Sequence, residues 1–259
     1  RKFPDITVAV DRNRVNGVRA ILSERPGTGV IILDDGFQHR KITPGYSILL
    51  SDFERLMIRD HMLPYGNLRE SIRNMSRADI ILISKSPENI SPIQRRLIVK
   101  EVNKHPYQNL YFTTITYKKP VNVFDTTNPE NDFLSETHSE DRGIVLVTGI
   151  ANANPLSEFL QNKFSEIIHL HFRDHHEFTL NDIRKIMDSW NSLKTNLKYI
   201  ITTEKDAIRL REFTNIAEPI RSSFFYIPVG IDFLNDDKDE FDNMIVNYVR
   251  KNKRNNRVS

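Results

Sequence analysis

Two adjacent carboxylates follow an apolar run near the start of the chain. Asp34 and Asp35 come directly after Val30-Ile31-Ile32-Leu33, and Gly36-Phe37-Gln38-His39-Arg40 follows them. Four apolar residues, three of them β-branched, predict a buried strand. Ligands of open α/β sheets bind beyond the carboxyl ends of the strands, and an Asp at such an end commonly holds Mg²⁺ near a nucleotide's phosphates. We therefore predict a metal site here, with an ordinary Asp-Gly turn as the plainer alternative.

A second cluster combines a carboxylate with imidazoles. Asp174-His175-His176 follows the apolar segment 167–171, so these side chains also come at the end of a predicted strand. A carboxylate beside an imidazole fixes its tautomer and prepares it for proton transfer. Metal-dependent phosphoesterases use the same three residue types as ligands. They also need an upstream Asp-x-Asp and a downstream glycine-rich His motif, which we do not find, so the phosphoesterase is the weaker interpretation.

Isolated charged side chains complete the candidates. Arg14 follows the apolar segment 6–10, and Lys205 follows the segment 199–202. Arginine can hold two phosphate oxygens at once, whereas lysine acts as a point charge. Each of these residues has a plainer alternative, a solvated loop charge for Arg14 and a charge at the start of a helix for Lys205.

Five motifs along the chain together resemble one known family. They are Asp34–His39, Leu63–Glu70, Gly149–Asn152, Phe172–Phe178 and Thr203–Ala207. The residues of these motifs, and the order of the motifs along the chain, resemble those of the tetraacyldisaccharide 4′-kinase family, the lipid A 4′-kinases. The chain departs from the family at Asn67, where a second proline is usual, and at Thr43-Pro44-Gly45, where an Arg-Asp pair is usual. No role of that pair is transferred to this chain.

The resemblance implies an activity and its cofactors. It implies transfer of the ATP γ-phosphoryl group to the 4′-hydroxyl of a tetraacylated glucosamine disaccharide 1-phosphate in lipid A biosynthesis, with ATP and Mg²⁺ as cofactors. The lipid and the inner-membrane surface are the expected partners, and the cytoplasmic face of the bacterial inner membrane is the expected location of a peripheral protein. A non-catalytic nucleotide-binding module remains an alternative beside the phosphoesterase.

The resemblance also implies roles for particular residues. The expected metal ligands are Asp34, Asp35 and Glu70. Phosphate or substrate contacts are expected from Arg14, His39, Arg69 and Lys205. The expected catalytic residues are His175, which takes part in proton transfer, Asp174, which orients or stabilises its ring, and Asp35.

The family's phosphate-binding loop has no counterpart in this sequence. The nine glycines include no Gly-x-x-x-x-Gly-Lys-Ser/Thr motif. We therefore expect the chain to be the C-terminal part of a longer protein and to be inactive by itself.

Composition excludes several classes of protein. A net charge of +3 is too small to indicate nucleic-acid binding. The absence of cysteine rules out disulfides, thiolate metal sites and cysteine nucleophiles. No apolar stretch approaches the ~20 residues that a transmembrane helix needs.

Alternating strand-like and helix-like segments predict an α/β fold. Strands are expected near 6–10, 30–33, 46–50, 80–83, 110–116, 144–148, 167–171, 199–202 and 224–229. Helices are expected near 15–22, 93–102, 183–190 and 241–249, the third capped by Thr179 or Asn181. The resemblance specifies a P-loop NTPase-like, mainly parallel sheet flanked by helices and incomplete at its N-terminus, with a second, smaller α/β domain. We expect a kinase core over 1–117, a linker over 118–142 and a C-terminal domain over 143–259.

Overall fold

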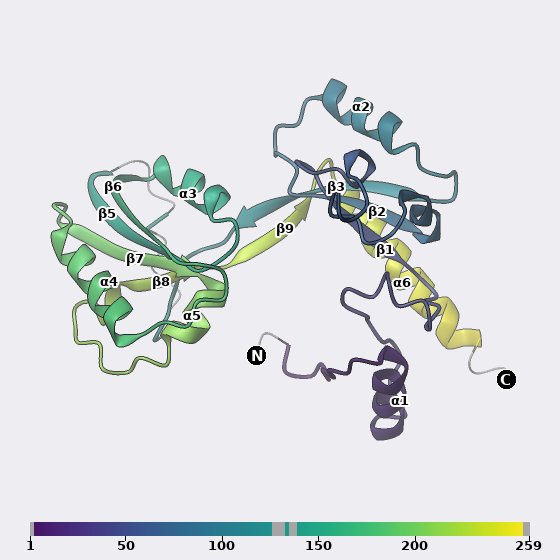
Figure 1. Ribbon diagram of the computed structural model, residues 1–259, viewed down its shortest axis with the longest axis horizontal. Coiled ribbons are helices and arrows are strands. Elements are labelled where there is room, and N and C mark those ends of the chain that lie inside the picture. The colour runs from purple at the N-terminus through teal and green to yellow at the C-terminus, as the bar shows by residue number, and fades with distance from the viewer. Residues whose placement is uncertain (1–2, 126–132, 135–138, 256–259) are drawn as a thin grey trace. The chain divides into compact units, whose positions relative to one another are not determined.

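The chain forms two compact units in a computed structural model that describes residues 3–125, 133–134 and 139–255. The first unit comprises Arg1–Ile115 and Ile231–Ser259, and the second comprises Thr116–Gly230. Each unit has its own sheet, and Figure 1 labels most of the helices and strands of both. None of the helices within the described residues is both long enough and apolar enough to cross a membrane.

The first unit is built on a four-stranded sheet with the order β1-β2-β3-β9. The bounds are Ile48–Asp52 for β1, Ile80–Ser84 for β2, Asn109–Tyr117 for β3 and Val229–Phe233 for β9. β2 pairs in parallel with both β1 and β3. Ile81, Ile83 and Phe112 are fully buried beneath α2 (Pro92–Val102), so alternate residues of β2 fill the core of this unit.

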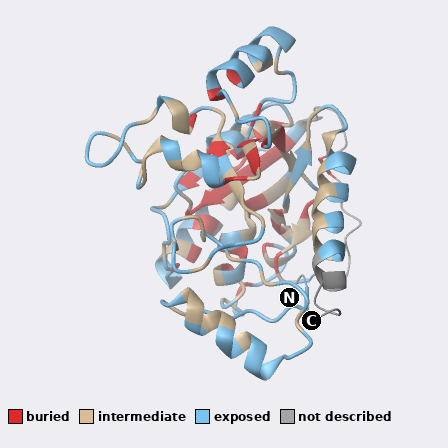
Figure 2. Cartoon of the chain, turned by 90° about the vertical axis from the view of Figure 1, so that its right-hand side faces the viewer, coloured by how far each residue is buried: buried red, intermediate tan, exposed pale blue. Residues whose placement is uncertain are grey.

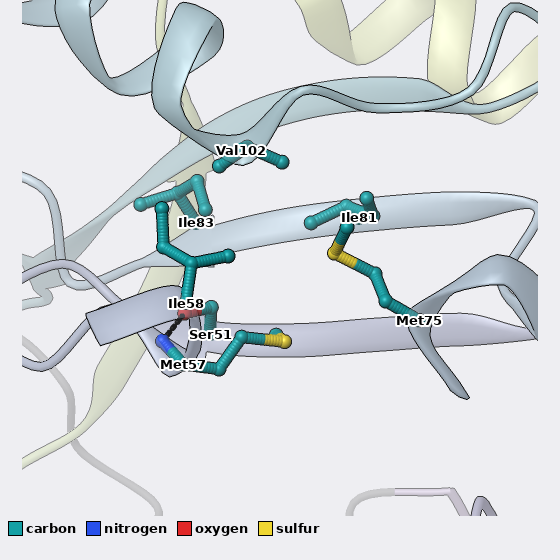
Figure 3. Close-up of a pocket in the computed structure, with 7 residues that line it drawn as sticks. All are labelled: Ser51, Met57, Ile58, Met75, Ile81, Ile83 and Val102. Atoms are coloured by element: carbon teal, nitrogen blue, oxygen red, sulfur yellow. Dashed lines mark hydrogen bonds between the residues drawn. The ribbon is translucent and has the colours of Figure 1, made fainter. Parts of the chain in front are cut away.

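Shorter elements complete the first unit. α1 (Arg14–Glu24) is capped by Asn13, and the 3₁₀ helices η1 (Met57–Arg59) and η2 (Ile72–Arg77) lie between β1 and β2 in the chain. Figure 3 shows an apolar hollow lined by Met57, Met75 and side chains of β2, where the Met57 amide donates to Ser51 Oγ at 2.9 Å. Because the Ser51 hydroxyl already has a partner and the rest of the lining is apolar, the hollow belongs to the core packing.

α6 (Asp237–Asn255) packs on the first unit. Tyr111 of β3 donates a hydrogen bond to Glu240 at 3.1 Å, and Arg95 of α2 pairs with Asp237 at 3.1 Å. The segment after residue 230 therefore joins the first unit, whereas the sequence grouped it with the C-terminal domain. The expected linker also differs, because 118–125 belongs to the second unit; residues 126–132 and 135–138 of that linker lie outside the described part.

The second unit contains a five-stranded sheet with the order β4-β8-β7-β5-β6. The bounds are Val121–Asn122 for β4, Ser139–Thr148 for β5, Phe164–His171 for β6, Leu197–Thr203 for β7 and Phe224–Ile227 for β8. β5 pairs in parallel with β6 and β7, β7 pairs in parallel with β8, and β4 is antiparallel to β8. The carboxyl ends of β5, β6 and β7 therefore meet at one edge.

Helices cover both faces of this sheet, as Figure 1 shows. They are α3 (Asn154–Gln161), α4 (Leu180–Ser192) and α5 (Glu204–Leu210), with the 3₁₀ helix η3 (Arg221–Ser223) before β8. Val145 and Val147 face the core under α4 and α5, whereas Ile144 and Leu146 face the core under α3. Buried residues therefore alternate between the two faces of β5. In Figure 2, buried residues gather on the strands near the middle of the view, and much of the surrounding ribbon is exposed or intermediate.

Two expected strands are wrong. Segments 6–10 and 30–33 have no strand structure, and Val8 and Ile32 are 81% and 87% exposed. A strand needs a neighbour to complete its hydrogen bonds and cover its apolar face, and neither segment pairs with a strand in the described part of the chain. Asp34 and Asp35 therefore do not follow a strand here.

Most other elements agree with the sequence. Helices α1, α2, α4 and α6 were expected, and Thr179 caps α4 by accepting from the Asp182 amide. α3 and β4 were not expected, and α5 was anticipated only in the alternative interpretation of Lys205. The run 224–229 is divided between β8 and β9.

Candidate functional site

A tight turn presents the two adjacent carboxylates of the first unit. Asp35 has a left-handed φ of 47°, and a Cβ on Gly36 would lie 2.7 Å from Leu33 Cβ, so this position requires glycine. Asp34 and Asp35 are exposed, whereas Phe37 packs against the core of the first unit. The turn is therefore anchored at Phe37 and open at its carboxylates.

Arginines surround the acidic groups in what we call the acid–arginine cluster, comprising Asp35, Arg40, Arg69, Glu70 and Arg77. Arg69 Nη1 lies 3.9 Å from Asp35 Oδ2, and Arg40 Nη2 lies 3.6 Å from Glu70 Oε2. Arg77 Nη2 donates to the same Glu70 oxygen. The structure thus brings together the turn at 34–40 and the Leu63–Glu70 motif.

The three expected metal ligands do not form one ligand set. Across residues 3–125, 133–134 and 139–255, no group of three or more His, Cys, Asp or Glu side chains is placed to hold a metal ion. Glu70 is engaged by arginines. Asp34 and Asp35 still fit Mg²⁺, which is often held by one or two carboxylates together with substrate phosphates and water. Metal binding by these residues stays a prediction.

Arg77 is a member of the cluster that the sequence did not indicate. Its Nη1 donates to the Phe37 carbonyl at 3.0 Å, and its guanidinium carbon lies 4.3 Å from the centre of the Phe37 ring. Arg77 is 40 residues from Phe37 along the chain and falls in no recognisable motif. No local signal reveals this contact, because it depends on the tertiary fold.

Arg14 and His39 are not linked to the charged groups of the cluster. Arg14 donates to the Asp11 carbonyl within its own turn, and no described hydrogen bond or ion pair joins it to Asp34 or Asp35. His39 is half-buried, and its amide donates to the Gly36 carbonyl at 3.0 Å. Their expected substrate contacts stay predictions.

A separate charged triad lies in the second unit, at the end of β6 and the start of α5. Lys205 Nζ donates to Asp174 Oδ1 at 2.9 Å and lies 3.4 Å from His175 Nε2. His175 Nε2 is 3.7 Å from Asp174 Oδ2, and the His175 backbone is left-handed, with φ 61°. The hydrogen bond from Lys205, helped by the nearby His175, holds the pKa of Asp174 below its ordinary value. The structure therefore brings together three of the predicted residues.

His176 faces a different environment. Its Nε2 lies 3.0 Å from Asp182 Oδ2, and its ring stacks on Phe172 at 4.7 Å. Asp182 also forms the capping box of α4 with Thr179. These contacts give His176 a structural role, in contrast to the exposed ring of His175.

Asp206 is a buried acid that the sequence analysis left without a role. Its Oδ2 accepts from the Gly149 amide at 2.9 Å and from Thr203 Oγ1 at 2.7 Å, and its side chain is fully buried. Asp206 therefore ties the loop after β5 to the first turn of α5. A carboxylate one residue after Lys205 in a recognised motif was the available signal, but its burial was not evident from the sequence.

Comparisons with known proteins agree with one another. The sequence profile of the family described as "Tetraacyldisaccharide-1-P 4'-kinase" matches residues 1–250. The tetraacyldisaccharide 4′-kinase of Bacteroides thetaiotaomicron is 42% identical, covering 100% of this chain and 69% of the relative. The enzyme of the same name from Phocaeicola vulgatus is 41% identical, covering 100% and 70%.

A solved structure shows the fold. The crystal structure of LpxK from Aquifex aeolicus in complex with ATP is similar, with a TM-score of 0.61 and 21% identity. The similarity covers 93% of this chain, which spans 64% of the crystallised one. The expected fold class, a mainly parallel α/β architecture flanked by helices, is confirmed.

Proposed function

The chain belongs to the tetraacyldisaccharide-1-P 4′-kinase family, and from this we propose that the protein transfers the ATP γ-phosphoryl group to the 4′-hydroxyl of a tetraacylated glucosamine disaccharide 1-phosphate. This reaction is a step of lipid A biosynthesis. The observation that carries the proposal is the match of relatives with this activity across the whole chain at 41–42% identity.

The acid–arginine cluster supplies the groups that phosphoryl transfer uses. Asp34 and Asp35 would hold Mg²⁺, which neutralises charge on the β- and γ-phosphates when it is bound. Arg69 is exposed and close to Asp35, so its guanidinium is available to phosphate oxygens. Glu70 balances the charge of Arg40 and Arg77.

The triad of the second unit supports proton handling. Lys205 keeps Asp174 ionised by lowering its pKa, and Asp174 Oδ2 lies 3.7 Å from His175 Nε2, close enough to orient the ring for proton transfer. His175 is 72% exposed at its side chain and can therefore meet a substrate or another catalytic group. In this proposal Lys205 acts on Asp174 rather than on phosphate.

A membrane location follows from the proposed substrate. Its acyl chains lie in a bilayer, so we propose peripheral binding to the cytoplasmic face of the bacterial inner membrane. Sedimentation with phospholipid vesicles containing the lipid substrate tests this proposal. Full-length protein that stays in the supernatant would contradict it.

The reaction itself is tested by incubating the full-length protein with Mg²⁺, radiolabelled ATP and the lipid disaccharide. Label should appear at the 4′ position when both substrates are present. Release of phosphate from the lipid without ATP would indicate a phosphoesterase instead, and ATP binding without turnover would indicate a binding module.

A further inference from the structure

Arg77 links two parts of the first unit that are distant in sequence. One planar group donates to the Phe37 carbonyl, covers the Phe37 ring and pairs with Glu70. The turn that carries Asp34 and Asp35 is thereby tied to the segment that carries Glu70.

The base of this link is held by the core. Arg77 is the last residue of η2, and the next residue, Ala78, is 1% exposed and donates its amide to the Met75 carbonyl at 3.0 Å. β2 begins at Ile80, which is fully buried. The Arg77 backbone therefore has a fixed position from which its side chain reaches the turn.

Apart from Arg77, the turn is held by the packing of Phe37 on the core and by two longer ion pairs, Asp35 with Arg69 and Arg40 with Glu70. Its described backbone hydrogen bonds are local: the amides of His39, Arg40 and Ile42 donate to the carbonyls of Gly36, Gln38 and His39 at 3.0–3.2 Å. Phe37 is only two residues from Asp35, so fixing Phe37 restricts the directions open to both carboxylates. A phosphoryl-transfer site needs its charged groups held in place before the reaction.

We propose that Arg77 is a positioning residue that fixes the orientation of Asp34 and Asp35 by clamping Phe37, with Glu70 as its anchor. The contribution to catalysis rests on the proposed kinase function, whereas the mechanical link does not. Arginine suits the task because its guanidinium can stack, bond a carbonyl and pair with a carboxylate together, which a lysine ammonium cannot.

Hydrogen–deuterium exchange on the full-length kinase tests the link without relying on activity. In Arg77→Met, amides of the segment 36–42 should exchange about tenfold faster, the factor expected when one charge-assisted hydrogen bond is lost. Arg73→Met is the matched control, because Arg73 lies on the same η2 and has no described ion pair. Its exchange should equal that of the wild type.

Kinetics test the catalytic part. Arg77→Met should raise the Mg²⁺ concentration for half-maximal rate about tenfold or more and lower kcat, while KM for the lipid stays within about twofold. Arg77→Lys keeps the charge beside Glu70 but not the stacked, carbonyl-bonded geometry, so it should not restore the Mg²⁺ response. If Arg77 served only to stabilise the fold through its charge, Arg77→Lys would restore the wild-type Mg²⁺ response.

Several results would overturn the proposal. They are equal exchange of 36–42 in Arg77→Met and Arg73→Met, an unchanged Mg²⁺ response, or full rescue by Arg77→Lys. If β2 amides also exchange faster in Arg77→Met, that variant has loosened the fold itself. The Mg²⁺ response of Arg77→Lys then decides whether Arg77 positions the turn. A wild-type protein without kinase activity would refute the proposed function. The exchange experiment would still test whether Arg77 holds the turn that carries Asp34 and Asp35.

Discussion

Replacing Asp206 by alanine should strongly destabilise the second unit. The carboxylate is fully buried and accepts from the Gly149 amide at 2.9 Å and from Thr203 Oγ1 at 2.7 Å. Each hydrogen bond to a charged group contributes about 1.5–3 kcal/mol, and alanine leaves the buried Gly149 amide without this acceptor. Relief from burying a carboxylate offsets part of the loss. We expect a net loss of about 3 kcal/mol for Asp206→Ala and about 1–2 kcal/mol for Asp206→Asn, which keeps the size and one acceptor oxygen.

Urea unfolding followed by tryptophan fluorescence measures this loss. Trp190 is the only tryptophan of the chain and lies on α4, so its emission follows the second unit. With a slope of about 1.5 kcal/mol per molar urea for a domain of this size, the midpoint of Asp206→Ala should fall by about 2 M. The control is Asp188→Ala. Asp188 is exposed and lies on α4, so its replacement should change the free energy of unfolding by less than about 0.5 kcal/mol. Equal midpoints for Asp206→Ala and Asp188→Ala would refute the reasoning.

The other predictions concern the two charged sites. Asp34→Ala and Asp35→Ala should each lower kcat of the full-length kinase about 10²-fold at saturating Mg²⁺ with the fold retained, and near-normal turnover in both would exclude the metal role. His175→Ala should lower kcat with KM for ATP unchanged; a rise in that KM alone would point to nucleotide binding. Lys205→Met should raise the pKa of Asp174 towards its ordinary value in an NMR titration, because the largest lowering influence is removed while that of His175 stays. Because the pKa of Asp174 is depressed by Lys205, the stability from this pair is present above the ordinary carboxylate pKa and is lost as the pH falls through the depressed one. Residues 1–259 alone contain no Gly-x-x-x-x-Gly-Lys-Ser/Thr loop, so they should show no tight MgATP binding in calorimetry, and micromolar affinity would contradict this.

The sequence predicts a helix, strand or cap correctly where the residues that determine it are close together along the chain. The run Ile80-Ile81-Leu82-Ile83 predicts a buried strand, and β2 is one. Thr179 was a candidate helix cap, and its hydroxyl accepts from the amide three residues later. The alternating faces of β5 also follow from the two-residue period of a strand.

The same kind of pattern failed where partners are distant in sequence. Residues 30–33 are as apolar as β2, yet they form no strand because the described chain offers them no neighbouring strand. The motif at 63–70 predicts a metal role for Glu70, which stays a prediction, but it does not reveal the contacts of Glu70 with Arg40 and Arg77, which arise from the tertiary fold. The sequence therefore indicates candidate groups for chemistry, but it does not indicate which of them contact one another.

The connectivity of the first unit has a consequence for synthesis on the ribosome. The chain leaves this unit through β3 and returns through β9, so Thr116–Gly230 is complete before β9 and α6 emerge. N-terminal domains usually fold first during translation, but here the inserted unit can fold before the sheet that precedes it is finished. Once folded, the insertion holds its ends together, with the Lys118 amide 2.9 Å from the Pro228 carbonyl. Closing a loop costs entropy that grows with its length, and a pre-folded insertion replaces more than a hundred flexible residues by a short bridge. We therefore expect mutations that unfold the second unit to delay the docking of β9 beside β3 in the newly made chain.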